Sequence, residues 1–195
     1  MEITVVEGDV TEIETEVLIV NLFETVDAPA GATGAVDSAI GGLITELISD
    51  GEITGAVSAS VLIHTPNSAY PKFKPSRVLV VGLGSEESFD LNVARRVSAA
   101  VIRRLRTSGV KNAATIVHGA GIGGIDRAAG AQALTEGSLL GSYRFNKYKK
   151  ADPKRRDNIE TLTVIEHDSS KMSAIYAGVE KGIVYSQADT LARDL

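Results

Sequence analysis

The stretch most suggestive of chemistry is a glycine-rich turn between an apolar segment and a helix-forming segment. In TIVHGAGIGGIDRAAGA, residues 115–131, Gly119, Gly121 and Gly124 match the G-x-G-x-x-G spacing of dinucleotide-binding turns. A dinucleotide site also needs an acidic residue about 20 positions further on, at the end of the next strand. That interval falls near Arg144, inside a predicted helix, so the pattern is incomplete. What remains is a strand-to-helix turn that either binds an anion through its backbone amides or only connects two elements.

The three histidines form a second candidate cluster because each ends a predicted strand. His64, His118 and His167 could converge, since the carboxyl ends of parallel strands line the ligand crevice of an open sheet. The simpler interpretation is that each is bonded to backbone. The sequence has no H-E-x-x-H pair, no cysteine, no G-x-S-x-G turn and no Walker A lysine. We therefore predict neither a metal site nor catalytic residues in this chain.

Composition indicates one globular domain of the cytoplasm. The chain has 195 residues, of which 44% are hydrophobic and 23% charged, a length that suits a single domain over residues 1–195. No apolar run approaches the roughly 20 residues of a membrane span, so we expect no membrane contact. The first residues, MEITVVEGDV, lack a basic region and predict no secretory signal. The absence of cysteine fits a reducing compartment.

Charge is unevenly distributed along the chain. Residues 144–156, RFNKYKKADPKRR, hold seven basic residues and one acidic residue, whereas the remainder holds 13 basic and 24 acidic residues. Such a stretch can contact nucleic acid or an acidic partner, or can be a solvated loop. An isoelectric point of about 5.3 makes nucleic acid the least favoured partner. The candidate contact residues are Lys149, Lys150, Arg155 and Arg156.

Strand and helix patterns alternate along the sequence. Apolar runs predict strands, and apolar residues spaced three or four apart predict helices. This alternation indicates an α/β fold with three layers, in which helices flank a mixed, mostly parallel sheet. The last helix has no terminating glycine or proline, and we expect it to lead into a further domain. The predicted strands are residues 3–8, 17–23, 58–64, 77–84, 113–118 and 160–167, and the predicted helices are residues 36–48, 89–107, 126–145 and 170–195.

Several segments, in order, resemble the N-terminal domain of the leucyl aminopeptidases, cytosolic two-metal exopeptidases that form hexamers. The segments are GDVTEIETEVLIVNLFE, GGLITELISDGEITG, RVLVVGLGSEESFDLNVARR, EGSLLGSYRFNKYK and GVEKGIVYSQADTLARDL. The resemblance covers essentially the whole chain. It implies a domain that supports hexamer assembly and shapes access to the active sites.

The same resemblance places the chemistry outside this chain. The family's catalytic domain carries the lysine and the Asn-Thr-Asp-Ala-Glu-Gly-Arg stretch that hold two divalent metals, Zn or Mn, and no segment here is similar to either. The chain is therefore expected to have no cofactor and not to be catalytic alone. Its implied partners are the catalytic domain and neighbouring subunits.

This domain is also similar in fold to macro domains, which bind ADP-ribose. EGDVT resembles their opening motif and places Asp9 at the adenine, while LIVN places Asn21. A departure is Glu24, where macro domains usually carry an asparagine near the ribose, because a carboxylate there would repel a diphosphate. The binding of ADP-ribose or a related nucleotide phosphate therefore stays an alternative function. The glycine loops implied for it contain Gly31 and Gly34 in the first, and Gly119, Gly121, Gly123 and Gly124 in the second.

Overall fold

The computed structural model describes residues 1–119, 124–145 and 158–195. Strands and helices alternate along most of this part, as predicted. None of its helices is long and apolar enough to cross a bilayer. The elements are β1 (Glu2–Glu7), β2 (Val17–Leu22), α1 (Gly31–Ala39), α2 (Leu43–Ser49), β3 (Ser60–His64), β4 (Arg77–Gly82), the 3₁₀ turn η1 (Glu86–Ser88), α3 (Leu91–Thr107), β5 (Asn112–Thr115), α4 (Arg127–Ser142), β6 (Thr161–Glu166) and α5 (Ser169–Asp194).

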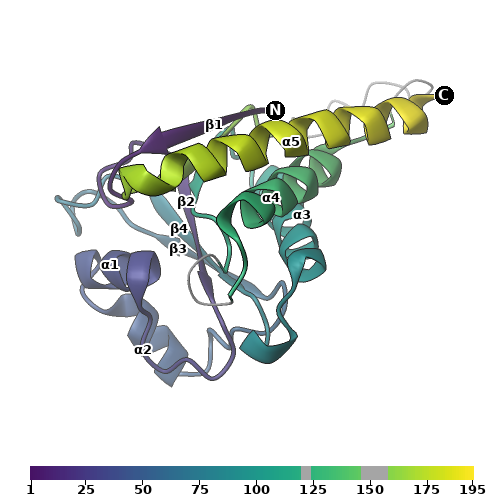
Figure 1. The fold of residues 1–195 in the computed structure, drawn as a ribbon. Helices are drawn as coiled ribbons and strands as arrows, with labels where there is room; N and C mark the ends of the chain where they lie inside the picture. The colour runs from purple at the N-terminus through teal and green to yellow at the C-terminus, as the bar shows by residue number, and fades with distance from the viewer. Residues whose placement is uncertain (120–123, 146–157) are drawn as a thin grey trace.

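One six-stranded sheet, in the order β1-β6-β5-β2-β4-β3, forms the middle layer. All neighbouring pairs are parallel except β3 with β4, so the predicted mixed, mostly parallel sheet is confirmed. Helices α3, α4 and α5 lie together on one side of the sheet, and α1 and α2 lie apart from them (Figure 1). Consecutive parallel strands require long crossover connections, which α3 supplies between β4 and β5 and α4 supplies between β5 and β6.

The strand β2 shows why the sheet is covered on both faces. Val17 and Ile19 belong to the core beneath α3, α4 and α5, whereas Leu18 and Val20 belong to the core beneath α1 and α2. All four are at most 1% exposed. A strand that is buried on both faces has a continuous run of apolar residues, and residues 17–20, VLIV, form such a run.

The single helix predicted over residues 36–48 was wrong, because the structure breaks it into α1 and α2. Gly41 and Gly42 adopt φ angles of +75° and +85°, which a right-handed helix does not contain. The buried carboxylate of Asp37 then accepts hydrogen bonds from the backbone amides of Ile44 and Thr45 at the start of α2. A side chain of α1 thus caps α2. The break was not predicted because the apolar spacing of the sequence continues across Gly41 and Gly42.

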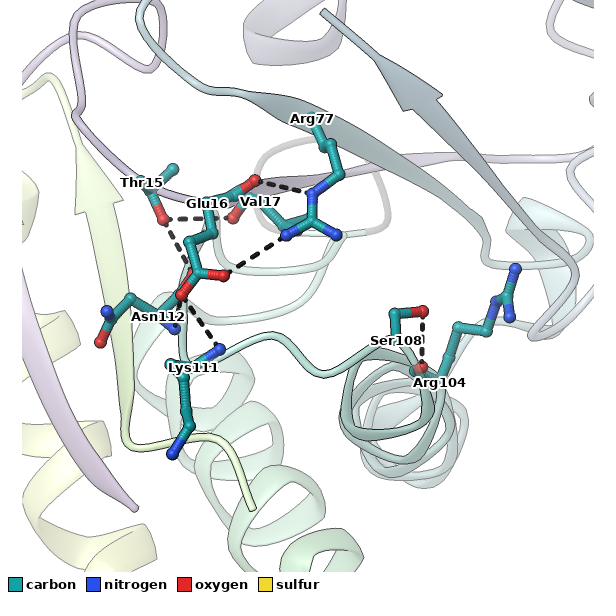
Figure 2. Close-up of polar contacts among 8 residues, drawn as sticks. All are labelled: Thr15, Glu16, Val17, Arg77, Arg104, Ser108, Lys111 and Asn112. Atoms are coloured by element: carbon teal, nitrogen blue, oxygen red, sulfur yellow. Dashed lines mark hydrogen bonds and ion pairs between the residues drawn. The ribbon is translucent and has the colours of Figure 1, made fainter. Parts of the chain in front are cut away.

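A second carboxylate ties together the amino ends of three strands. Figure 2 shows Glu16, just before β2, accepting hydrogen bonds from the backbone amides of Lys111 and Asn112 at the start of β5. Its other oxygen lies 3.4 Å from Nη2 of Arg77, the first residue of β4. Glu16 therefore joins its own strand to both neighbours at one edge of the sheet, which aligns their carboxyl ends at the opposite edge.

The helices α4 and α5 approach closely because glycines line their contact. A Cβ atom on Gly178 of α5 would fall well inside contact distance of the carbonyl oxygen of Ala128 on α4. One turn further along, Gly182 meets the side chain of Thr135 in the same way. The close contact holds the first turn of α4 against the part of α5 around Gly178.

Gly178→Ala is expected to lower the free energy of unfolding by about 1–3 kcal/mol, because the added methyl group must push α4 away. Alanine also favours the helix by about 1 kcal/mol relative to glycine. This gain offsets part of the steric cost but does not cancel a cost of about 3 kcal/mol. Urea denaturation measures the change. Ser173→Ala, on an exposed position of the same helix, is the matched control and should change stability by less than about 0.5 kcal/mol. A Gly178→Ala variant as stable as the control would contradict the close-packing argument.

Candidate functional site

A pocket of about 690 Å³ opens where the parallel strands end. Its walls come from the ends of β1, β2 and β6, from the segment after β5, and from the first turns of α1, α4 and α5. This is the edge at which open α/β sheets bind ligands, and the volume lies in the range of small-molecule sites. Most of the lining residues are apolar. Four predicted binding residues line it: Asp9, Asn21, Gly31 and Gly119.

The other predicted residues lie elsewhere or outside the described part. Gly34 is not a lining residue; a Cβ there would collide with the carbonyl oxygen of Pro29, so this glycine serves a close backbone contact. Gly124 is exposed, with a φ angle of +63°, and does not line the pocket either. Gly121 and Gly123, like Lys149, Lys150, Arg155 and Arg156, lie outside the described residues, so their predicted roles stay predictions.

Asp9 is held as a carboxylate at the end of the pocket next to β1. Its Oδ1 accepts hydrogen bonds from the backbone amide and the hydroxyl of Thr11, both 2.7 Å long. These bonds, with a smaller contribution from His167, hold the pKa of Asp9 below its ordinary value. A carboxylate in this place accepts hydrogen bonds and repels anions.

Asn21 is fixed from two sides at the end of β2. Its backbone carbonyl oxygen accepts a 2.8 Å hydrogen bond from the hydroxyl of Thr33 on α1. Its side-chain amide lies 3.2 Å from Nδ1 of His118. Burial lowers the pKa of His118 to about 4, so the ring is neutral near pH 7 and Nδ1 can accept from the amide. The bond from Thr33 thus holds the backbone of Asn21, and the contact with His118 positions its side-chain amide.

The expectation that the three histidines converge holds for two of them at most. His118 and His167 follow β5 and β6 at the pocket edge. His64 ends β3, the antiparallel strand, and pairs with Arg77 at the start of β4, which places it at the opposite edge. Across the described residues, no group of three or more His, Cys, Asp or Glu side chains could hold a metal ion.

Sequence reasoning missed several polar residues of the pocket. Glu166 ends β6, Lys171 lies in the first turn of α5, and Arg127 is the first residue of α4; His167, which also lines the pocket, was already among the candidate histidines. Their signal was positional: each follows a strand at the edge where all parallel strands end. Glu24, predicted to repel a diphosphate, is not among the described lining residues.

Comparison with known proteins assigns the family. The model of the cytosol aminopeptidase family, N-terminal domain, matches residues 19–152. The chain belongs to this family. A probable cytosol aminopeptidase of Roseiflexus castenholzii is 31% identical over 196 residues, which cover all of this chain and 36% of that protein. The cytosol aminopeptidase of Pseudomonas aeruginosa is 30% identical over 163 residues, covering 83% of this chain and 31% of its own length. The chain thus spans about a third of these relatives.

Solved structures extend the likeness to two groups of proteins. A tomato leucine aminopeptidase variant has a TM-score of 0.71 at 18% identity, covering 98% of this chain and 36% of its own. An Oceanobacillus iheyensis macrodomain variant solved with ADPR has a TM-score of 0.68 at 11% identity, covering 92% of both chains. At these identities the structures show a shared fold. The cytosol aminopeptidase domain therefore has a macrodomain-like α/β architecture, as the sequence predicted.

The buried His118 predicts a pH dependence of stability. Its folded-state pKa of about 4 lies below the ordinary 6.5, so between these values the unfolded chain binds the extra proton and stability falls as pH falls. The slope is about 1.4 kcal/mol per pH unit in this window. Urea unfolding at pH 7.5 and pH 5 should show the wild type losing about 2 kcal/mol more than His118→Gln. Equal losses in both proteins would contradict the burial of an uncharged ring.

Proposed function

We propose that this chain is the non-catalytic N-terminal domain of a cytosol aminopeptidase, a cytoplasmic enzyme that removes N-terminal residues from peptides. The domain docks on the catalytic part of the enzyme through the outer face of α5. In this position it supports the assembly of neighbouring subunits and shapes access to the active site. The family match supports the proposal, and the outer face of α5 is the observation that carries it.

The second half of α5 is apolar on the side turned away from the core. Ile175, Gly178, Val179, Gly182 and Ser186 form the buried face of the helix. At 100° per residue, the opposite face carries a series of exposed apolar residues, which we call the outer stripe. In the stripe, Val184 is 60% and Leu191 64% exposed. The stripe consists of Ala177, Val184, Ala188, Leu191 and Leu195.

The spacing of the outer stripe suits packing against another helix or a groove. From Val184 the stripe continues at intervals of four, three and four residues, which is the spacing of a helix seam. Large apolar side chains lined up on an exposed helix face mark an interaction site. Because the chain spans about a third of its relatives' length, we assign the stripe to the remaining, catalytic part of the enzyme.

The metals of the enzyme are proposed to reside in that catalytic part. Two-metal hydrolysis requires several carboxylates around ions about 3.5–4 Å apart. The described residues of this chain supply no such donor set. Zn or Mn, which the resemblance implies, would thus be bound by the partner domain, and no step of the reaction is assigned to residues of this chain.

Co-expression tests the docking face. This chain and the part of the Roseiflexus castenholzii enzyme outside the matched region are expected to co-purify as one complex, measured by light scattering after size exclusion. Leu191→Glu should reduce recovery of the complex at least about 10-fold, because it removes roughly 2 kcal/mol of apolar burial and buries a charge.

The control for this experiment is Gln187→Glu, which adds the same charge at an exposed position of α5 outside the outer stripe. It should leave recovery unchanged. Equal recovery of the complex with Leu191→Glu and with Gln187→Glu would overturn the docking role of the stripe.

The pocket favours a second candidate function, the binding of a nucleotide phosphate such as ADP-ribose. Macrodomains of the same fold have been solved with ADPR and with ADP. Here Asp9 lies in the pocket as a carboxylate able to accept from an exocyclic amine, and the side-chain amide of Asn21, on the pocket wall, contacts Nδ1 of His118. Glu24 is not among the described residues that line the pocket, although its neighbour Phe23 is.

Calorimetry with ADP-ribose tests this second function. The wild type is expected to bind, and Asp9→Asn to bind about 10-fold more weakly, because a hydrogen bond to a charged group is worth about 1.5–3 kcal/mol. Glu12→Gln removes the same charge from an exposed residue three positions away and serves as control. No saturable heat from the wild type would rule ADP-ribose out.

A further inference from the structure

The two edges of the sheet differ in how they are covered. At the β1 edge, α5 packs along the strand (Figure 1), and the hydroxyl of Tyr176 donates a 2.9 Å hydrogen bond to the backbone carbonyl oxygen of Val5. At the other edge, β3 pairs with β4 on its inner side, and no described strand pairs with its outer side. An edge strand left open in this way is a template for pairing with a further strand.

The alternation of hydrogen bonds determines which backbone groups of β3 point outward. Just after the strand, the backbone amide of Thr65 donates to the carbonyl oxygen of Ser76, its partner in the register of β3 with β4. Because bonded residues alternate along an antiparallel pair, every second residue counted back from Thr65 also bonds to β4. The N–H and C=O groups that point to the open side are therefore those of Ser60, Leu62 and His64. No described residue outside the strand forms a hydrogen bond with these groups.

The sequence around this edge lacks the charges that normally protect edge strands from pairing. Residues 53–71 contain no Asp, Glu, Lys or Arg, which makes them the longest run of this kind in the chain, and they include all of β3. By contrast, β1 at the covered edge begins and ends with a glutamate. Val57, just before β3, is 42% exposed. Depletion of charged residues marks the centre of protein–protein contacts, so this composition favours another protein strand as the occupant of the edge.

A second copy of this chain fits the edge better than a charged partner does. The chain has a formal net charge of −5, so two copies repel each other where their acidic surfaces meet. In a contact with two-fold symmetry, a residue close to the axis faces itself in the other copy, and a charged residue there would face a like charge. The run without charges avoids this repulsion. A strongly charged peptide would find no opposite charge in it.

The strand β3 is also self-complementary in an antiparallel register. With Leu62 on a two-fold axis, the outward groups of Ser60 lie opposite those of His64 in the second copy, so each outward N–H meets an outward C=O. Val61 then lies beside Ile63 of the second copy, which is an apolar cross-strand pair. Because the contact is two-fold and the β1 edge is covered by α5, pairing ends at two copies.

From the open edge, its lack of charge and its self-matching register, we infer that two copies of this chain join their sheets edge to edge through antiparallel pairing of β3 with β3. The inference rests on the proposed function in that it names the surface through which neighbouring subunits meet. It is separate from docking on the catalytic part, because that role is assigned to the outer stripe of α5.

Amide hydrogen exchange, measured by NMR at two concentrations of this chain, tests the pairing without any variant. The amides of Leu62 and His64 should exchange about 2- to 3-fold more slowly at about 0.5 mM than at about 0.05 mM, because mass action raises the share of dimer. The amide of Ile63, which bonds to β4 in both states, should exchange at the same rate and serves as the internal control. Sedimentation velocity should show monomer and dimer over this range. Exchange at Leu62 and His64 that does not depend on concentration would overturn the inference.

His64→Pro tests the backbone contact directly. It removes an outward N–H without removing a bond to β4, and edge strands accept proline at such positions. The dimer should dissociate at least about 10-fold more readily, because the symmetric pairing loses this hydrogen bond twice. His64→Ala keeps the N–H and should weaken the dimer by less than about 3-fold. Thermal unfolding checks that both variants are folded, and His64→Pro should still co-purify with the catalytic part at wild-type recovery.

Each other result has a definite meaning. A dimer that persists in His64→Pro but is lost in Leu191→Glu assigns self-association to the outer stripe and overturns the inference. A wild type that stays monomeric, with β3 amides protected only when the catalytic part is added, assigns the edge to that part and also overturns it. A dimer that depends on His64 in this way, in a chain that does not co-purify with the catalytic part, supports the inference and overturns the proposed docking.

Discussion

Parallel pairing of five strands is the constraint on which the remaining features of this domain depend. Because β1, β6, β5, β2 and β4 run in one direction, their carboxyl ends and the starts of the following helices meet at a single edge. The pocket is a consequence of that arrangement. The antiparallel β3 is the exception, and it explains why His64 lies away from His118 and His167 although all three end strands. At the opposite edge, Glu16 fixes the relative register of β2, β4 and β5 (Figure 2).

Capping divides the helices into two kinds. Aspartates at the starts of α3, α4 and α5 satisfy backbone donors locally and stabilise the helices without any ligand. The start of α1 lacks this stabilisation, and Arg127 adds an unfavourable charge to α4. Both departures occur on residues that line the pocket. Local sequence rules that are broken next to a cavity are typical of functional sites.

The parts of the fold that the sequence predicted are those set by local apolar pattern. VLIV predicted a strand buried on both faces, and the spacing of Ile175, Val179 and Ile183 predicted the last helix. The break at Gly41 and Gly42 was not predicted, because the apolar spacing runs through it and the compensating bond comes from the more distant Asp37. Asp9 and Asn21, which line the pocket, were predicted from the resemblance to macro domains and not from the apolar pattern.

Arg127 was not predicted at all. Only the folded chain brings it to the same pocket as α1, about 100 residues earlier in the sequence. A basic residue after a glycine turn is ordinary until its place in the folded chain is known. Residue type and spacing carry no information on which elements meet at one edge of the sheet.

The pocket and the outer stripe share one helix, and the geometry of α5 keeps them independent. Lys171, in the first turn, belongs to the pocket, whereas Val184 of the outer stripe lies 13 residues later, roughly 20 Å along the axis at 1.5 Å per residue. The stripe also faces away from the buried residues that hold α5 against α4. Residues this far apart with no shared contacts contribute additively to stability. Loss of partner docking in a stripe variant therefore reports on the outer face alone, and loss of ADP-ribose binding in a pocket variant reports on the pocket alone.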